Sequence, residues 1–173
     1  MTKRSLALLM LALCVNVAVQ LPAGVTAGPT EDVQAAMQLL KAKATALGPP
    51  SIRGEELVAG RTVPVLYFGS TKMNNNFQLV DEIQKEKGGT ATIFARSGSE
   101  FIRVATNVKK DDGSRAIGTI LDPKGKAFAA ILKGDSYFGD AEILGRPYIT
   151  GYEPIRGAGS DVIGVYYVGY ARD

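Results

Sequence analysis

The sequence predicts an α+β fold with one antiparallel sheet. Apolar residues recur at helical spacing over residues 29–47, whereas later apolar segments are short, rich in β-branched and aromatic residues, and bounded by glycine or aspartate. Residues 162–169 (VIGVYYVG) are apolar on both faces, which is typical of a central strand. The order of helix, strand, helix, strands, short helix and strands favours one domain of the α+β class.

Residues 1–27 have the features of a cleaved secretory signal peptide. Lys3 and Arg4 precede an apolar run that polar residues and a proline interrupt before it reaches the roughly 20 residues a membrane-spanning helix needs. Small residues lie just before Gly28, as signal peptidase requires. We therefore expect a single mature domain over residues 28–173, located in the periplasm or secreted. The alternative is an uncleaved anchor.

Composition excludes several classes of function. The 173-residue chain has no His and a single Cys, Cys14, so it cannot build a His-based catalytic triad, a disulfide or a zinc site of the usual ligands. Without residues 1–27 it has 18 basic and 17 acidic residues, a balance that argues against a nucleic-acid partner. No cofactor or metal motif is present, and none is expected.

The mature chain begins with a predicted amphipathic helix over residues 29–47, which Gly48-Pro49-Pro50 ends. Residues 51–60 are predicted as a loop, residues 63–68 as a strand, and residues 73–76 (MNNN) as the start of a second helix. For the Asn run we favour a helix N-cap over a ligand clamp. The expected inward residues are Val33, Ala36, Met37, Leu40, Ala44 and Leu47 in the first helix, and Phe77, Val80 and Ile83 in the second, with Leu79 as a further candidate.

Residues 90–107 (TATIFARSGSEFIRVATN) are predicted to form a β-hairpin around the turn Ser97-Gly98-Ser99. Arg103 is a permanent cation inside the second strand, and alternation places it on the same face as Phe101 and Ala105. Arginine is rarely buried without a partner, so Arg103 either lies on a solvated sheet face or is aimed at an anion.

The second half of the chain is predicted to hold one short helix and several strands. Arg115 follows a charged turn, at the point where the chain re-enters the fold and could face a site. A short helix is predicted over residues 126–132, and short strands over residues 136–138 and 142–144.

A further strand is predicted over residues 148–152 (YITGY). Alternation places Tyr148, Thr150 and Tyr152 on one face, as a row of three hydroxyl groups. Such a row indicates either the wall of a polar pocket or a surface strand whose residues were selected for β-propensity.

Five stretches together resemble the Cache family of extracytoplasmic sensor domains, specifically the Cache type 3/type 2 fusion of bacterial chemoreceptors and sensor kinases. They are VLYFGSTKMNNNF (65–77), GGTATIF (88–94), FIRVATNVKKDDGSRAIGT (101–119), LGRPYITGYEPI (144–155) and VIGVYYVGY (162–170).

The resemblance implies a PAS-like fold, with a long N-terminal helix packed on a five-stranded antiparallel sheet, short helices, and a small-ligand pocket on the sheet's other side. It also implies a sensory role in chemotaxis or signal transduction outside the inner membrane. Cache domains are normally followed by a transmembrane helix and an output domain, whereas this sequence ends at Asp173. We therefore expect a binding domain without an output domain of its own.

The functional hypothesis is a domain that binds a small organic acid. Arginine matches a carboxylate through two parallel hydrogen bonds, and nearby hydroxyls can satisfy the remaining oxygen lone pairs. The candidate ligand-binding residues are Arg103, Thr106, Arg115, Tyr148, Thr150 and Tyr152.

The expected partners are a membrane chemoreceptor, sensor kinase or transporter, and the domain is expected as a monomer or a weak dimer through its N-terminal helix. One alternative is a structural or accessory partner of such a membrane protein with no ligand of its own. An enzyme that uses carboxylates is less favoured, because acids such as Asp111 and Asp122 lie in turns.

Overall fold

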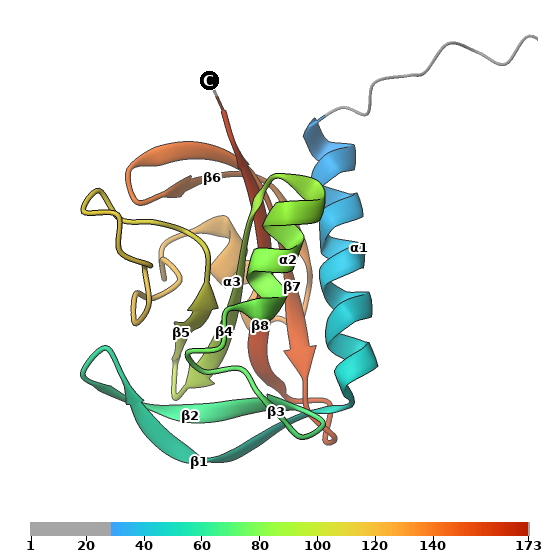
Figure 1. The fold of residues 1–173 in the computed structure, drawn as a ribbon, viewed down its shortest axis with the longest axis vertical. Coiled ribbons are helices and arrows are strands. Elements are labelled where there is room, and N and C mark those ends of the chain that lie inside the picture. Colours follow the sequence, from blue (N-terminus) through green and yellow to red (C-terminus); the bar gives the residue numbers. More distant parts are fainter. Residues whose placement is uncertain (1–28, 173) are drawn as a thin grey trace, which may run out of the picture.

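The computed structural model describes residues 29–172 and consists of two antiparallel sheets with three helices (Figure 1). The predicted signal peptide lies outside the described residues. One sheet has five strands in the order β5-β4-β8-β7-β6, and the other has three in the order β1-β2-β3. The elements are α1 (Pro29–Leu47), β1 (Pro50–Val58), β2 (Arg61–Phe68), β3 (Thr71–Lys72), α2 (Gln78–Lys87), β4 (Thr90–Ser97), β5 (Glu100–Thr106), α3 (Lys126–Leu132), β6 (Tyr137–Ile143), β7 (Arg146–Arg156) and β8 (Val162–Ala171).

The α+β class and the five-stranded antiparallel sheet are confirmed, with β8 in the centre as its apolar sequence predicts. The predicted strands at residues 136–138 and 142–144 are one continuous strand, β6, which pairs with β7 along its whole length. The polar residues between the two apolar ends of β6 make the strand look interrupted in the sequence. They are expected there, because the side chains of an edge strand alternate between facing solvent and facing the core.

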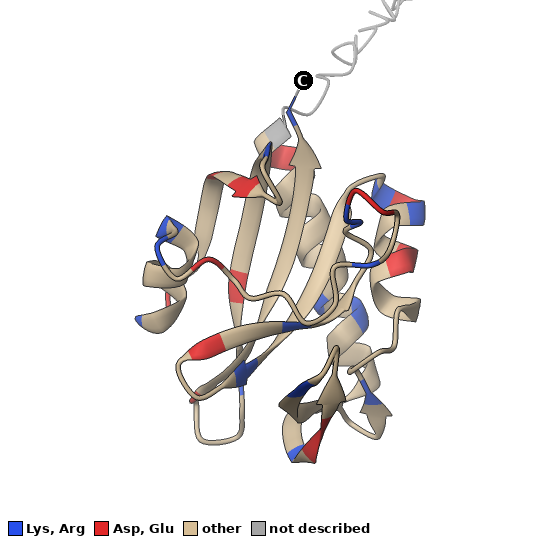
Figure 2. Cartoon of the chain, turned by 90° about the vertical axis from the view of Figure 1, so that its left-hand side faces the viewer, with Lys and Arg blue, Asp and Glu red and all other residues tan. Residues whose placement is uncertain are grey.

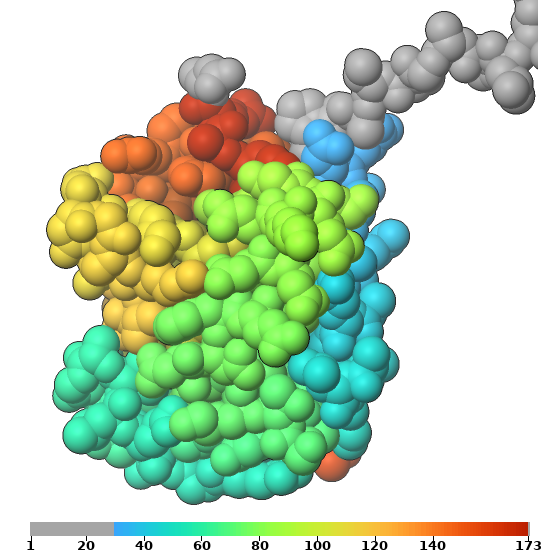
Figure 3. All heavy atoms as spheres, viewed as in Figure 1, coloured from blue at the N-terminus to red at the C-terminus, as the bar shows by residue number. Residues whose placement is uncertain are grey.

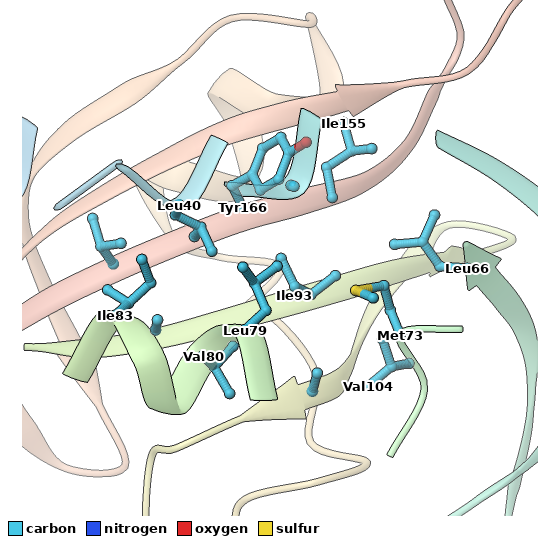
Figure 4. Packing of buried hydrophobic residues seen from close by; sticks show 14 of the residues in the cluster. Leu40, Leu66, Met73, Leu79, Val80, Ile83, Ile93, Val104, Ile155 and Tyr166 are labelled. Atoms are coloured by element: carbon cyan, nitrogen blue, oxygen red, sulfur yellow. The ribbon is translucent and has the colours of Figure 1, made fainter. Parts of the chain in front are cut away.

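Helices α1 and α2 cover one face of the five-stranded sheet (Figure 1). The inward residues predicted for α1 are all fully buried except Leu47, which is 40% exposed where the helix ends. Figure 4 shows how Leu40 of α1 and Ile83 of α2 lie over Ile93 and Tyr166 of the sheet. This face is a close-packed, mostly aliphatic core.

Residues 51–60, predicted as a loop, form most of strand β1 and its turn, so the prediction of a single sheet is wrong. Strand β1 pairs with β2 through a register shift between Ile52 and Glu55. The turn that joins the two strands has positive φ at Ala59 (49°) and Gly60 (80°), as a tight hairpin turn requires. Strand β1 is an edge strand with little burial, so its sequence lacks an apolar period.

The Asn run precedes α2 but does not provide its N-cap, which is Phe77 without a side-chain cap bond. The helix begins later than predicted, and Asn76, one residue before the N-cap, accepts a hydrogen bond from the Gln78 backbone N–H at 3.1 Å. Asn74 is 1% exposed and bonds strand β2 instead, accepting from Leu66 N at 3.1 Å and donating to Pro64 O at 3.1 Å. Its role is structural.

Candidate ligand-binding cavity

A cavity of about 390 Å³ lies on the face of the five-stranded sheet that α1 and α2 leave uncovered. Arg103 of β5 and Tyr152 of β7 line it from the sheet, while residues 119–122, residues 124–127 and strand β6 line its sides. Aliphatic residues such as Leu121 and Ile143 supply much of the remaining buried lining.

Charged residues other than Arg103 occur only at the solvent-facing part of this lining. Asp122, Lys124, Lys126, Asp140 and Glu142 are all exposed. Figure 2 looks onto this side of the molecule and shows most charged residues in the segments around the sheet rather than along its strands. Among the described residues that line the cavity, Arg103 is therefore the one charged side chain in its buried interior.

Arg103 is 4% exposed, and burial lowers the pKa of its guanidinium from the ordinary value, against the opposing influence of nearby Tyr167 and Tyr152. Arginine nevertheless keeps its proton in proteins. Its Nη1 donates to Thr119 Oγ1 at 2.7 Å, and its guanidinium carbon lies 5.1 Å from the centre of the Phe94 ring. The cation is thus buried and firmly placed.

No residue of the described range 29–172 neutralises the guanidinium. Within residues 29–172, no carboxylate lies within ion-pair distance of Arg103, and its buried Nε has no hydrogen-bond partner. A buried charge without a counter-ion and a buried donor without an acceptor are both costly, and such groups concentrate at functional sites. Thr119 takes one hydrogen bond from Nη1, and the buried Nε is left as a donor without a partner within residues 29–172.

A β-bulge separates the orientation of Ala105 from that of Arg103. Ile93 pairs with Ala105 and the next residue, Phe94, pairs with Arg103, so Val104 is the extra residue of β5. Arg103 and Phe101 share the cavity face, as predicted, but Ala105 lies on the opposite face in the core under α1 and α2. Strict alternation fails here because the bulge inserts one residue.

Tyr152 is the second cavity-lining residue among the predicted candidates. It is 2% exposed, and its ring lies 5.0 Å from that of Tyr167 and 6.3 Å from that of Tyr137. Desolvation raises the pKa of Tyr152 far above its ordinary value, so the phenol stays protonated and can donate a hydrogen bond. An adjacent cation and a neutral phenol form a lining suited to an anion.

The other two residues of the hydroxyl row and Thr106 lie on the same face of the sheet but do not line this cavity. Thr106 Oγ1 is 2.6 Å from Thr92 Oγ1, and Thr150 donates to Gly139 O at 2.7 Å. Tyr148 borders a separate, more open hollow of about 440 Å³ beside Arg172. The structure therefore brings together Arg103 and Tyr152 but not the whole row.

Arg115 does not line the cavity, and both of its terminal nitrogens have other partners. Its two terminal nitrogens bond both carboxylate oxygens of Asp81 on α2 at 2.7 and 2.9 Å, and Nη1 also donates to Thr106 O at 2.8 Å. The guanidinium lies over Phe77, 4.3 Å from the ring centre. These contacts tie the loop after β5 to α2.

Thr119 is the cavity-lining partner of Arg103 and is not among the residues that the sequence predicts for the site. Its hydroxyl accepts from Arg103 and donates to Ala116 O at 2.8 Å, which fixes the direction of its lone pairs. No sequence pattern marks it, because the contact depends on residues 116–121 folding back along β5. Among residues 29–172, no group of three or more His, Cys, Asp or Glu is placed to hold a metal ion.

The fold and the cavity define a PAS-like ligand-binding domain. The family model of the Cache 3/Cache 2 fusion domain matches residues 30–173, so the chain belongs to this family. Cache domains are extracytoplasmic sensory domains that bind small molecules. A search of curated proteins found no match. In the part of the chain that is described, no helix is long and apolar enough to cross a membrane.

Proposed function

We propose that this domain binds a small organic carboxylate in the 390 Å³ cavity, with Arg103 as its anchor. The observation that carries the proposal is the buried guanidinium, whose Nε lacks a partner within residues 29–172. A carboxylate placed on the Nε and Nη2 edge would accept two parallel hydrogen bonds and supply the missing counter-charge.

The remaining lining supports the same ligand class. The protonated Tyr152 phenol offers a donor to a carboxylate oxygen, whereas a cationic ligand would meet Arg103 with like charge. The aliphatic residues Leu121, Ala127 and Ile143 suit a short carbon skeleton beyond the carboxylate. A compact acid with an apolar or weakly polar body fits these features.

We further propose that the domain is exported through a signal peptide at residues 1–27 and acts with a membrane chemoreceptor, sensor kinase or transporter. Membership of a family of extracytoplasmic sensors supports this proposal. Mass spectrometry of the exported protein should find a chain that starts at Gly28, and a chain that starts at Met1 would contradict it. Gel filtration should give a monomer or a weak dimer.

Calorimetry with acetate, propionate, pyruvate and succinate, each compared with its neutral amide, tests the ligand class. At least one acid should bind and its amide should not. Arg103→Ala should weaken binding by roughly 30- to 1000-fold, because losing a charged hydrogen-bond pair costs about 2–4 kcal/mol. Arg103→Lys should also lose affinity, since a point charge cannot reproduce the two parallel bonds.

Arg146→Ala is the matched control, because it removes one exposed positive charge whose partner, Asp111, is also exposed. It should leave affinity within about twofold of wild type. Equal binding of an acid to wild type and Arg103→Ala, or binding of amines alone, would contradict the proposed function.

A further inference from the structure

The cavity segment at residues 116–121 is bonded to β5 at the position of Arg103. Arg103 N donates to Thr119 O at 2.9 Å, Gly118 N donates to Arg103 O at 2.9 Å, and Leu121 N donates to Phe101 O at 2.9 Å. The backbone on both sides of Thr119 is therefore fixed to β5, and its hydroxyl holds the Arg103 guanidinium. Any shift of this segment moves the acceptor that orients Arg103.

The outer side of the same segment is in contact with the tip of the β1–β2 hairpin. Gly118 has φ +79°, and a Cβ built on it would lie 2.5 Å from Ala59 Cβ and 3.5 Å from Val58 O. Arg61, the first residue of β2, forms an ion pair with Glu100 at the start of β5. Figure 3 shows the hairpin and the segments around the cavity on the same side of the molecular surface.

We propose that the β1–β2 hairpin positions Arg103 for its ligand by holding Gly118 and Thr119, so that ligand binding and hairpin packing stabilise each other. This inference rests on the proposed function of the cavity. The hairpin lies outside the cavity lining, so its effect is indirect, through the backbone of residues 118 and 119.

Reciprocity follows from thermodynamic linkage. If hairpin contact raises the affinity of the Arg103 site by some factor, ligand binding must favour the packed hairpin by the same factor. The opposite end of the hairpin reaches the end of α1, where a Cβ on Gly69 would lie 2.1 Å from Leu47 O. Ligand binding on one face of the sheet is thereby connected to the helix on the other face.

Three variants separate this role from ordinary loss of structure. Gly118→Ala places a methyl group against Ala59, and the double variant Gly118→Ala with Ala59→Gly removes that clash. Gly113→Ala is the matched control, because Gly113 has nearly the same φ (+80°), lies in the same loop and has nothing within 4 Å of its added Cβ. It carries the same backbone strain without the hairpin contact.

The first measurement is the NMR resonance of the Arg103 Nε–H group in the ligand-free protein. Gly118→Ala should shift this resonance, the double variant should return it toward the wild-type position, and Gly113→Ala should leave it unchanged. An unchanged resonance in Gly118→Ala, or an equal shift in Gly113→Ala, would overturn the inference. This measurement needs no ligand and stands even if the proposed function fails.

The second measurement is hydrogen exchange of the backbone amides of residues 57–63 with and without saturating propionate, or whichever acid of the panel binds by calorimetry. Bound acid should slow exchange at the hairpin at least threefold in wild type. By calorimetry, Gly118→Ala should bind the acid at least tenfold more weakly than wild type, and the double variant should regain affinity. Tight binding with no change at the hairpin would overturn the coupling while leaving the proposed function intact. If no acid binds, the proposed function fails, and the inferred coupling falls with it.

Discussion

The two faces of the five-stranded sheet are made from alternate residues of the same strands, yet their chemistry differs. On the face under α1 and α2, Ile93 and Val168 are fully buried in a mostly aliphatic core. On the cavity face, Phe94 and Tyr167 surround a cation whose Nε has no partner within residues 29–172. We infer that the first face supplies stability and that the second gives up some stability for binding.

The largest expected effect comes from a cavity mutation on the helix face. Leu40 is fully buried between α1 and the sheet, so Leu40→Ala should lower the free energy of unfolding by about 2–5 kcal/mol. Denaturant unfolding measures this loss, and Leu132→Ala is the control because Leu132 is 51% exposed. Ligand affinity of the folded protein should stay near wild type. A large loss of affinity would show that the two faces are not separable.

Alkaline pH should act mainly through the buried phenols. Burial raises the pKa values of Tyr152, Tyr166 and Tyr167 above the ordinary value near 10. Between the unfolded and folded pKa values the unfolded chain loses protons that the folded chain keeps, so stability is full below about pH 10 and falls as pH rises further.

Each of these tyrosines should remove up to about 1.4 kcal/mol per pH unit above that point. Thermal unfolding between pH 8 and pH 11 measures the fall, and Tyr152→Phe should reduce its steepness. A flat stability profile over this range would show that the phenols ionise normally.

Arg115 offers a direct contrast with Arg103, since both were candidate anion-binding residues. Arg115 is paired with Asp81, a partly exposed carboxylate, so Arg115→Ala should cost about 1 kcal/mol of stability. Calorimetry should find ligand affinity within about twofold of wild type. Asp81→Asn should give a similar cost and no further loss when combined with Arg115→Ala.

The smallest expected effects concern single hydroxyl groups. Tyr152→Phe removes a donor in the cavity and should weaken acid binding by roughly 3- to 10-fold, since a neutral hydrogen bond contributes about 1 kcal/mol. Tyr148→Phe is the control because Tyr148 borders the other hollow, and it should leave affinity unchanged. Equal losses in both variants would place the ligand elsewhere on this face.

The sequence predicts the helices, the hairpin and the central strand because each has a clear apolar period or turn signal. It could not predict strand β1, since an exposed edge strand needs no apolar period. Nor could it predict the opposite orientation of Ala105. Strict alternation assigns every second residue to the same face, and the extra residue of the bulge at Val104 reverses that assignment for Ala105.

The cavity was predictable only in part. A lone arginine in an apolar strand indicates an anion site, and Arg103 does line the cavity. Arg115 has the same residue type, but its pairing with Asp81 joins residues 34 positions apart and leaves no local pattern. Thr119 was missed for the same reason, since its contact depends on the backbone folding along β5.

Thermal unfolding of wild type and Arg103→Met, each with and without the acid panel, tests the central claim most directly. If Arg103 serves ligand binding at a cost in stability, ligand-free Arg103→Met should be more stable than wild type by about 1 kcal/mol. This corresponds to a rise in Tm of roughly 2–4 °C, because an apolar side chain replaces an uncompensated buried charge. It should also show no response to acids that stabilise wild type. A variant that unfolds at a lower temperature than wild type, yet is still stabilised by the same acid, would contradict this account.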